Sequence, residues 1–190
     1  MEKETKRVKL VEDILGGGFL DHHIQEALED GADANASGSD GMTPLMAVSR
    51  NCGTPEIRLL LERGADPRPA DMFGRTALHY AVISLDEDNG IQLLIEAGAD
   101  VHAVDRNGNT PLHTAAVNSE WTGKVGAECL LRHDADPFAR TNKGKTPFDL
   151  AGDSETKVLL KAAMENRSLA SDLEIKLGTP GDKFWRGPRA

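Results

Sequence analysis

The chain has 190 residues, a length that fits a single domain, and carries a net charge of −9 with a pI near 5.1. This acidic balance argues against nonspecific binding to nucleic-acid phosphates, and no apolar run reaches the roughly 18 residues of a membrane span. We therefore expect neither a nucleic-acid nor a membrane partner. The charged N-terminus shows no signal peptide, and Cys52 and Cys129 form no metal-binding pair. Reduced thiols and a cytoplasmic location are expected.

Residues 1–36 are predicted to form an N-terminal capping unit. Apolar residues at helical spacing indicate one helix before the triple glycine at 16–18 and a second helix from about Asp21 to Gly31. The triple glycine lacks the Lys and Ser or Thr of a phosphate-binding loop, so we interpret it as a helix breaker. His22 and His23 are adjacent and point about 100° apart on a helix, which suits solvation better than metal binding.

Three short phrases then recur along the chain with a nearly constant period. Thr-Pro-Leu or a close variant begins at Thr43, Thr76, Thr110 and Thr146, at steps of 33, 34 and 36 residues. A glycine stands two residues before each threonine, and Gly-Ala-Asp or Asp-Ala-Asp occupies 31–33, 64–66, 98–100 and 134–136. Phrases that keep one register at one period indicate stacked units, each too short to bury its own apolar face.

Each period also contains the signals of two helices. Thr110 can cap a helix N-terminus, and Pro111 suits the first helical position because it lacks an amide hydrogen. The second stretch of each unit carries the larger apolar residues and ends at a glycine such as Gly64 or Gly98, which suits the left-handed position after a helix. Polar, glycine-rich turns are expected between successive units.

The phrases resemble the ankyrin repeat, which has a β-turn and two antiparallel helices per roughly 33 residues and a Thr-Pro-Leu-His signature. The resemblance covers about residues 12–165 and departs from the pattern at Met46, Asp149 and Asp134. It implies an all-α ankyrin-repeat solenoid of about five units including caps. The expected units are 1–36 (cap), 37–70, 71–104, 105–140 (with an insertion between its helices) and 141–165 (C-terminal cap), followed by a tail, 166–190.

The tail is expected to pack on the last repeat, mostly as loop with one short helical or extended piece near Leu173, because its apolar residues could cover the exposed flank of the stack. The last repeat helix is expected to end near Met164. Phe184 and Trp185 are interpreted as part of this covering, and a free binding motif is the alternative.

The second and third full units are longer than the first. The extra residues are expected in loops between the paired helices, at 84–90 and 118–124. Such insertions often lie on the binding face of a repeat protein. The acidic run 86–88 lacks the alternating ligand loop of a calcium site, which favours a solvated loop.

No arrangement in the sequence indicates catalysis. His79 and His113 occupy the signature position, where an imidazole links neighbouring turns, so we expect a structural role for both. We find no nucleophile with a plausible base and no spacing typical of metal ligands. We therefore expect no enzyme, no catalytic residue, no metal and no cofactor.

The resemblance implies that a partner protein binds to the turn tips and the first helices, which line a concave face. The predicted partner-binding residues are Asp40, Met42, Arg50, Met72, Phe73, Arg75, Ile83, Arg106, Asn107, Asn109, Asn118, Trp121, Lys143 and Lys145. Met72 and Phe73 form an unusually apolar tip, which is typical of an interface anchor; the alternative is that Phe73 folds back onto the next turn. Trp121 is either a binding hot spot or a cover for its own loop.

The sequence thus predicts a non-catalytic module that binds another protein and acts as an adaptor or scaffold. The alternative is a stoichiometric inhibitor of an enzyme, such as a bacterial immunity protein that neutralises a toxin. The acidic balance is compatible with a basic partner, and equally with a merely soluble protein. The free protein is expected to be a monomer.

Overall fold

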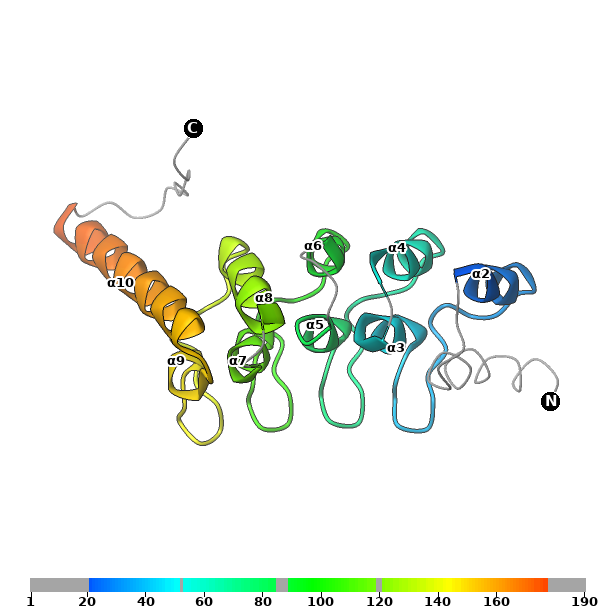
Figure 1. Ribbon diagram of the computed structural model, residues 1–190, viewed down its shortest axis with the longest axis horizontal. Helices are drawn as coiled ribbons and strands as arrows, with labels where there is room; N and C mark the ends of the chain where they lie inside the picture. Colours follow the sequence, from blue (N-terminus) through cyan, green and yellow to red (C-terminus); the bar gives the residue numbers. More distant parts are fainter. Residues whose placement is uncertain (1–20, 52, 85–88, 119–120, 178–190) are drawn as a thin grey trace.

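The computed structural model describes residues 21–51, 53–84, 89–118 and 121–177 (Figure 1). These residues form nine helices and no strand. The helices are α2 (Asp21–Glu29), α3 (Pro44–Asn51), α4 (Thr54–Glu62), α5 (Ala77–Ala81), α6 (Asn89–Glu96), α7 (Pro111–Val117), α8 (Trp121–Arg132), α9 (Pro147–Leu150) and α10 (Ser154–Leu177). The predicted all-α solenoid is confirmed.

The helices form two layers along the stack. The first helix of each unit, from α3 through α5 and α7 to α9, lies in the lower row of Figure 1, and α2, α4, α6 and α8 lie in the upper row. Each first helix packs against its own second helix and against the first helix of the next unit. The connections between units are long loops that project below the first helices in Figure 1, and successive loops lie side by side. This arrangement places a row of loop tips along one edge of the molecule.

A continuous apolar core runs between the layers. Its fully buried leucines recur at the repeat period, with Leu78 and Leu112 from first helices and Leu60, Leu94 and Leu130 from second helices. Burying one such side chain contributes about 1.5–3 kcal/mol relative to leaving it exposed. Buried alanines, such as Ala47, Ala81, Ala115 and Ala116, also line the first helices, and their small side chains let adjacent units approach closely.

The residue that follows each second helix has the left-handed conformation expected from the sequence, and in one unit an aspartate replaces the glycine. Gly31, Gly64 and Gly98 adopt φ of 87°, 84° and 96° after a second helix, in the left-handed region that glycine tolerates best. Asp134 takes the same place in the third full unit with φ 65°. Aspartate tolerates this region better than most residues, because its short side chain can form local hydrogen bonds.

The prediction that residues 118–124 form a loop is wrong for residues 121–124, which are helical. Helix α8 begins at Trp121 and has 12 residues, so most of the extra residues lengthen the helix. The cause is Gly123, which resembles a loop signal but serves close packing. A Cβ atom there would lie 2.0 Å from the Asn118 carbonyl oxygen and 2.6 Å from the Ala115 carbonyl oxygen.

The predicted end of the last helix near Met164 is also wrong. Helix α10 runs for 24 residues, from Ser154 to Leu177, and it contains neither proline nor glycine to stop it. The tail up to Leu177 is therefore helix and not the loop that we expected. That the tail packs on the last repeat stays a prediction.

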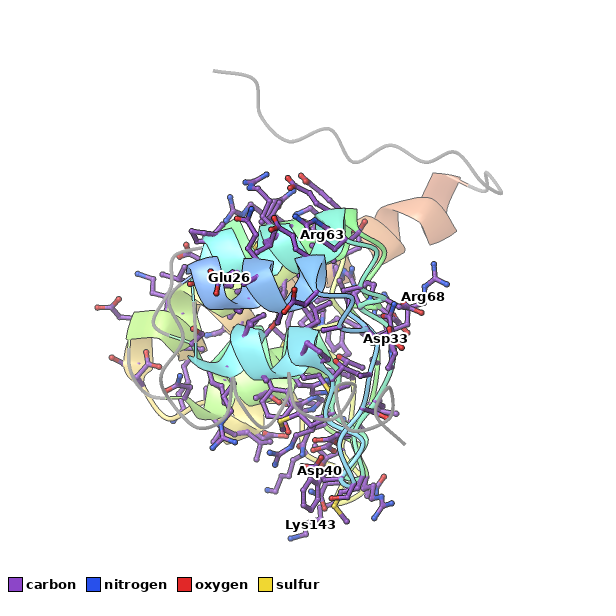
Figure 2. All side chains as sticks on the ribbon, turned by 90° about the vertical axis from the view of Figure 1, so that its right-hand side faces the viewer. Glu26, Asp33, Asp40, Arg63, Arg68 and Lys143 are labelled. Carbon is purple, nitrogen blue, oxygen red and sulfur yellow. The ribbon has the colours of Figure 1, made fainter. Side chains whose placement is uncertain are left out.

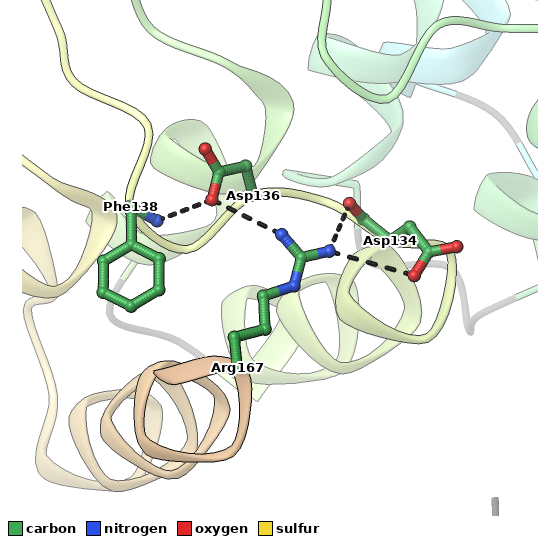
Figure 3. Close-up of polar contacts among 4 residues, drawn as sticks. All are labelled: Asp134, Asp136, Phe138 and Arg167. Atoms are coloured by element: carbon green, nitrogen blue, oxygen red, sulfur yellow. Dashed lines mark hydrogen bonds and ion pairs between the residues drawn. The ribbon is translucent and has the colours of Figure 1, made fainter. Parts of the chain in front are cut away.

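Arg167 joins helix α10 to the preceding unit (Figure 3). Its guanidinium donates to the Asp134 carbonyl oxygen at 2.9 Å and to Asp136 Oδ1 at 3.4 Å. A second contact, to the Asp134 carboxylate, measures 3.8 Å. The carbonyl at the left-handed residue thus gains a charged donor, and the side chain fixes the middle of α10 against the third full unit.

Several predictions concern residues outside the described ranges. They are the helix before the triple glycine at 16–18, Cys52, the acidic run at 86–88, and Phe184 with Trp185.

Candidate functional site

Two of the loops that project from the stack are closed by buried aspartates. Asp71 Oδ1 accepts hydrogen bonds from the backbone N–H groups of Phe73 and Arg75, both at 2.8 Å, and its Oδ2 accepts from the Tyr80 hydroxyl at 2.5 Å. Burial and the hydrogen bond to Asp71 raise the pKa of Tyr80 to about 12. The hydroxyl therefore remains a donor at physiological pH, and the loop has a fixed shape.

Asp105 accepts equivalent hydrogen bonds from the backbone of the next loop. Its Oδ1 accepts from the backbone N–H groups of Asn107 and Asn109 at 2.8 Å, and its Oδ2 accepts from the Asn109 side chain at 2.9 Å. Burial acts to raise the pKa of Asp105, but the hydrogen bonds from Asn109 and Asn107 outweigh it and lower that pKa. Our sequence analysis missed this role of Asp71 and Asp105, although each stands three residues before the loop glycine.

Neighbouring loops are bonded directly to one another. The backbone N–H of Met72 donates to the Asp40 carbonyl at 2.7 Å, and that of Arg106 donates to the Phe73 carbonyl at 2.9 Å. The backbone N–H of Asn142 continues the series, donating to the Asn107 carbonyl at 2.9 Å. We call the four bonded loops, residues 36–42, 69–75, 103–109 and 139–145, the hairpin edge. Because its members brace one another, the edge is a prearranged surface and not a set of independent loops.

The signature histidines join the first helices to this edge. His79 Nδ1 accepts from the Thr76 backbone N–H at 3.2 Å, so the proton is on Nε2, which donates to the Asn109 carbonyl of the next unit at 3.1 Å. His113 repeats the arrangement, with Nε2 3.1 Å from the Lys145 carbonyl oxygen. Burial lowers the pKa of both imidazoles. The predicted structural role, linking neighbouring turns, is confirmed.

The junction between units 37–70 and 71–104 lacks a histidine link. Met46 takes the histidine position in unit 37–70 and is buried, without a polar side chain to reach the next hairpin. Asn35 forms a different bond, which joins the capping unit 1–36 to unit 37–70. Its Nδ2 donates to the Gly64 carbonyl at 2.9 Å, and its Oδ1 accepts from the Asp66 backbone N–H at 2.7 Å.

The apolar tip predicted at Met72 and Phe73 is present on the surface. Met72 is 47% exposed and Phe73 is 52% exposed. The Arg75 guanidinium carbon lies 5.8 Å from the centre of the Phe73 ring, a cation–π distance. The alternative in which Phe73 folds back and is covered by the next turn is therefore not supported.

Most of the other predicted tip residues are accessible. Arg106, Asn107, Lys143 and Lys145 are exposed, while Asn109, which holds Asp105, is half-buried. Asp40 is also half-buried.

Met42 is the exception, and its predicted place at an exposed tip is wrong. It is 5% exposed and belongs to the core, because its apolar side chain packs inward where the equivalent Arg75 and Lys145 reach solvent.

The ends of the first helices carry further predicted partner-binding residues. Arg50 is exposed, Ile83 is 39% exposed and Asn118, half-buried, ends helix α7. Val117, at the position in its unit that corresponds to Ile83, is 57% exposed. Trp121 is the first residue of α8, but its side chain is outside what the structure describes, so its two interpretations stay open.

Within the described part of the chain, no group of three or more His, Cys, Asp or Glu side chains could hold a metal ion. None of its helices combines the length and apolar character needed to cross a lipid bilayer. Cys129 is buried in the core.

Comparison with known proteins agrees with this geometry. The chain matches the family described as ankyrin repeats (3 copies) over residues 14–105 and 86–168. The chain belongs to the ankyrin repeat family. Ankyrin repeats generally mediate contacts between proteins and are typically not catalytic.

A curated relative shares only part of the ankyrin stack. Over 54 residues, 28% of this chain, the sequence is 46% identical to the Ankyrin repeat and LEM domain-containing protein 1 homolog of Caenorhabditis elegans. The match covers 8% of that protein's length. The shared feature is therefore the repeat itself.

Proposed function

We propose that this ankyrin repeat chain is a non-catalytic adaptor or scaffold that binds a partner protein through the hairpin edge and the ends of the first helices. The observation that carries the proposal is the exposed pair Met72 and Phe73 on a loop fixed at both ends. Large apolar side chains on a rigid projecting surface are typical of binding anchors, and a rigid surface loses little conformational entropy on association.

The groups around this pair suit recognition. Arg75 lies over the Phe73 ring, Arg106 begins the next tip, and Asn107 offers an amide beside it. Arginine and aromatic residues are enriched at the centres of protein interfaces. Ile83 and Val117 continue the apolar character onto the ends of the first helices.

The remaining parts of the proposal follow from composition and family. We propose no catalytic activity, no cofactor, and neither a nucleic-acid nor a membrane partner. We further propose a cytoplasmic monomer in the absence of its partner.

The alternative function is stoichiometric inhibition of an enzyme, of the kind that an immunity protein exerts on a toxin. A row of exposed aspartates favours a basic target for this alternative. Asp66 and Asp100 stand at equivalent positions in the loops that follow the second helices, and Asp134, at the position of Gly64 and Gly98, adds a third exposed carboxylate. An enzyme captured by the chain that loses activity on stoichiometric addition would favour inhibition, and partners that keep their activities would favour the adaptor.

An affinity pull-down with the full chain, followed by mass spectrometry, supplies the partner for a direct test. Replacing both Phe73 and Arg106 by alanine should weaken partner binding by about 2–4 kcal/mol if both are anchors. Isothermal titration calorimetry measures the loss, and circular dichroism checks that the fold is unchanged. The matched control replaces Arg58 and Val158, an exposed cation and an exposed apolar residue on second helices, by alanine. Unchanged affinity in the Phe73 and Arg106 variant would place the binding site elsewhere.

A further inference from the structure

The charge of the hairpin edge is opposite to that of the whole protein. Its last three hairpins, residues 69–75, 103–109 and 139–145, carry five cations and two carboxylates, within a chain of net charge −9. All five cations are exposed: Arg75, Arg106, Arg140, Lys143 and Lys145. Figure 2 shows Lys143 at the tip of this edge, at the far end of the molecule from Glu26 and Arg63.

The two carboxylates of these hairpins are withdrawn from the surface. Asp71 and Asp105 are each 7% exposed. Both oxygens of each already accept hydrogen bonds from the chain itself. They therefore shape the loops while the cations face solvent.

None of these five cations forms an ion pair with another described residue. Elsewhere in the described residues basic side chains do form ion pairs, such as Lys124 with Glu155 at 2.9 Å and Arg167 with Asp136 at 3.4 Å. No such pair involves a cation of these three hairpins within the described ranges. Outside these hairpins, Asp149 feels two of the cations: its pKa is lowered first by hydrogen bonds from Thr146 and then, after the opposing effect of burial, by the charges of Lys145 and Arg140. Its Oδ2 already accepts from the Thr146 backbone N–H at 2.9 Å.

We infer that these three hairpins bind an acidic, extended segment of a partner protein, with an apolar residue of that segment seated against Met72 and Phe73. This inference rests on the proposed function and specifies the chemistry of the partner. Acidic side chains would supply the charge that the fold leaves unpaired along the edge. Carboxylates also form bidentate hydrogen bonds with arginine, which is available at Arg75, Arg106 and Arg140.

The spacing of the hairpins sets the spacing of the acids. Packed helices lie about 8–10 Å apart, and the hairpins share this step because neighbours are joined by backbone hydrogen bonds. An extended chain of the polyproline II type advances about 3.1 Å per residue with three residues per turn, so every third side chain faces the same side. The segment should therefore present an acidic residue at about every third position, roughly one for each hairpin.

A nucleic acid could also meet a basic edge, but two observations favour a protein segment. The net charge of −9 would repel a long polyanion as it approaches the molecule. The apolar tip at Met72 and Phe73, about half exposed, suits an apolar side chain better than a phosphate.

Selection from a random 12-residue peptide-display library against the full chain tests the inference. We expect enriched peptides with acids at about every third position and one large apolar residue. The variant Arg106→Glu/Lys143→Glu/Lys145→Glu should weaken binding of a selected synthetic peptide at least tenfold. The control Arg58→Glu/Lys157→Glu/Lys161→Glu changes net charge equally, on helices α4 and α10, and should bind within about twofold of the original chain.

Other measurements keep the test decisive if the charge-reversed variant fails to fold. On the unaltered chain, the affinity for the selected peptide should fall by about tenfold or more between low salt and 1 M salt, because the contacts are screened. A 12-nucleotide thymidine oligomer that binds more tightly than any selected peptide would overturn the inference in favour of nucleic acid.

The same selection separates failure of the inference from failure of the proposed function. Neutral or basic peptides that depend on Phe73 and Arg106 would overturn the acidic partner and leave the binding face in place. If no selected peptide is sensitive to substitutions at the hairpin edge, both proposals are wrong.

Discussion

Two glycines at equivalent hairpin positions offer a direct measurement of how strongly neighbouring hairpins brace one another. Gly108 has φ +78° and Gly144 has φ +72°, so alanine would be strained by a similar amount at both. At Gly108 the new Cβ would lie 2.7 Å from the Asn142 backbone nitrogen and 2.6 Å from its Oδ1. At Gly144 it would meet no atom within 4 Å.

The expected magnitudes differ for this reason alone. The left-handed conformation costs alanine about 1–2 kcal/mol at either position. Both changes also restrict the unfolded chain equally, which offsets part of that cost. Gly108→Ala must in addition push Asn142 away and break its two hydrogen bonds, from the backbone N–H to the Asn107 carbonyl and from Nδ2 to the Arg106 carbonyl, both 2.9 Å. At about 1 kcal/mol for each bond, Gly108→Ala should lose about 2 kcal/mol more stability than Gly144→Ala.

Urea unfolding followed by far-ultraviolet circular dichroism measures the two free energies of unfolding. Amide hydrogen exchange of Asn142 gives a local readout, and it should become faster in Gly108→Ala and stay unchanged in Gly144→Ala. Equal losses of stability, with equal exchange at Asn142, would refute the argument that neighbouring hairpins support each other.

Three further predictions concern the stability of the stack. Burial lowers the pKa of His79 and His113 in the folded protein. Their full contribution to the free energy of unfolding is therefore present above the unfolded pKa of about 6.5. It is lost as the pH falls below that value, by up to about 1.4 kcal/mol for each histidine at pH 5.5. Urea midpoints at pH 7.5 and 5.5 measure this, and His113→Ala should remove its own share of the pH dependence. Tyr80→Phe leaves Asp71 Oδ2 without its donor and should cost about 1–3 kcal/mol; a smaller loss when Asp71→Asn is already present would attribute the effect to this pair, whereas additive losses would argue against it. Truncation after Arg167 should lower the melting temperature and promote self-association, as read by calorimetry and sedimentation, and a truncated chain that melts like the full one would show that the tail does not cover the stack.

The helix pairs and their links could be predicted because single residues determine them locally. Thr110 and Pro111 specify a helix start whatever surrounds them, and His113 follows at the spacing that lets its ring reach back to Thr110 and forward to the next turn. Glycine at the ends of α2, α4 and α6 marks a backbone conformation that few other residues adopt. These features depend on the chain within a few residues, so the sequence alone reveals them.

The features that escaped prediction depend on neighbours that are distant in the chain or on the absence of a signal. Gly123 resembles a loop residue, yet it lies in α8, where its missing side chain admits the Asn118 carbonyl. Helix α10 continues past Met164 because nothing stops it, and an absent stop is hard to recognise without the packing around it.

The positive charge of the candidate site could not be read from the net charge of the chain, for a related reason. The net charge counts Asp71 and Asp105 equally with exposed acids, although burial removes them from the surface that a partner meets. Met42 was misplaced in the same way, since its exposed counterparts Arg75 and Lys145 are cations and it is apolar. Placing the loops in register along the repeat would have revealed both patterns.

The chemistry of the links between units has a consequence for where the stack comes apart. His79 and His113 join the last two junctions of the stack through rings that must stay neutral, whereas Asn35, an amide that does not titrate, joins the capping unit 1–36 to unit 37–70. Mild acid should therefore loosen the last two junctions selectively and leave the junction at the capping unit intact. At neutral pH these three links do not favour the opening of one junction over another. The pH of the surroundings therefore determines which junction opens first.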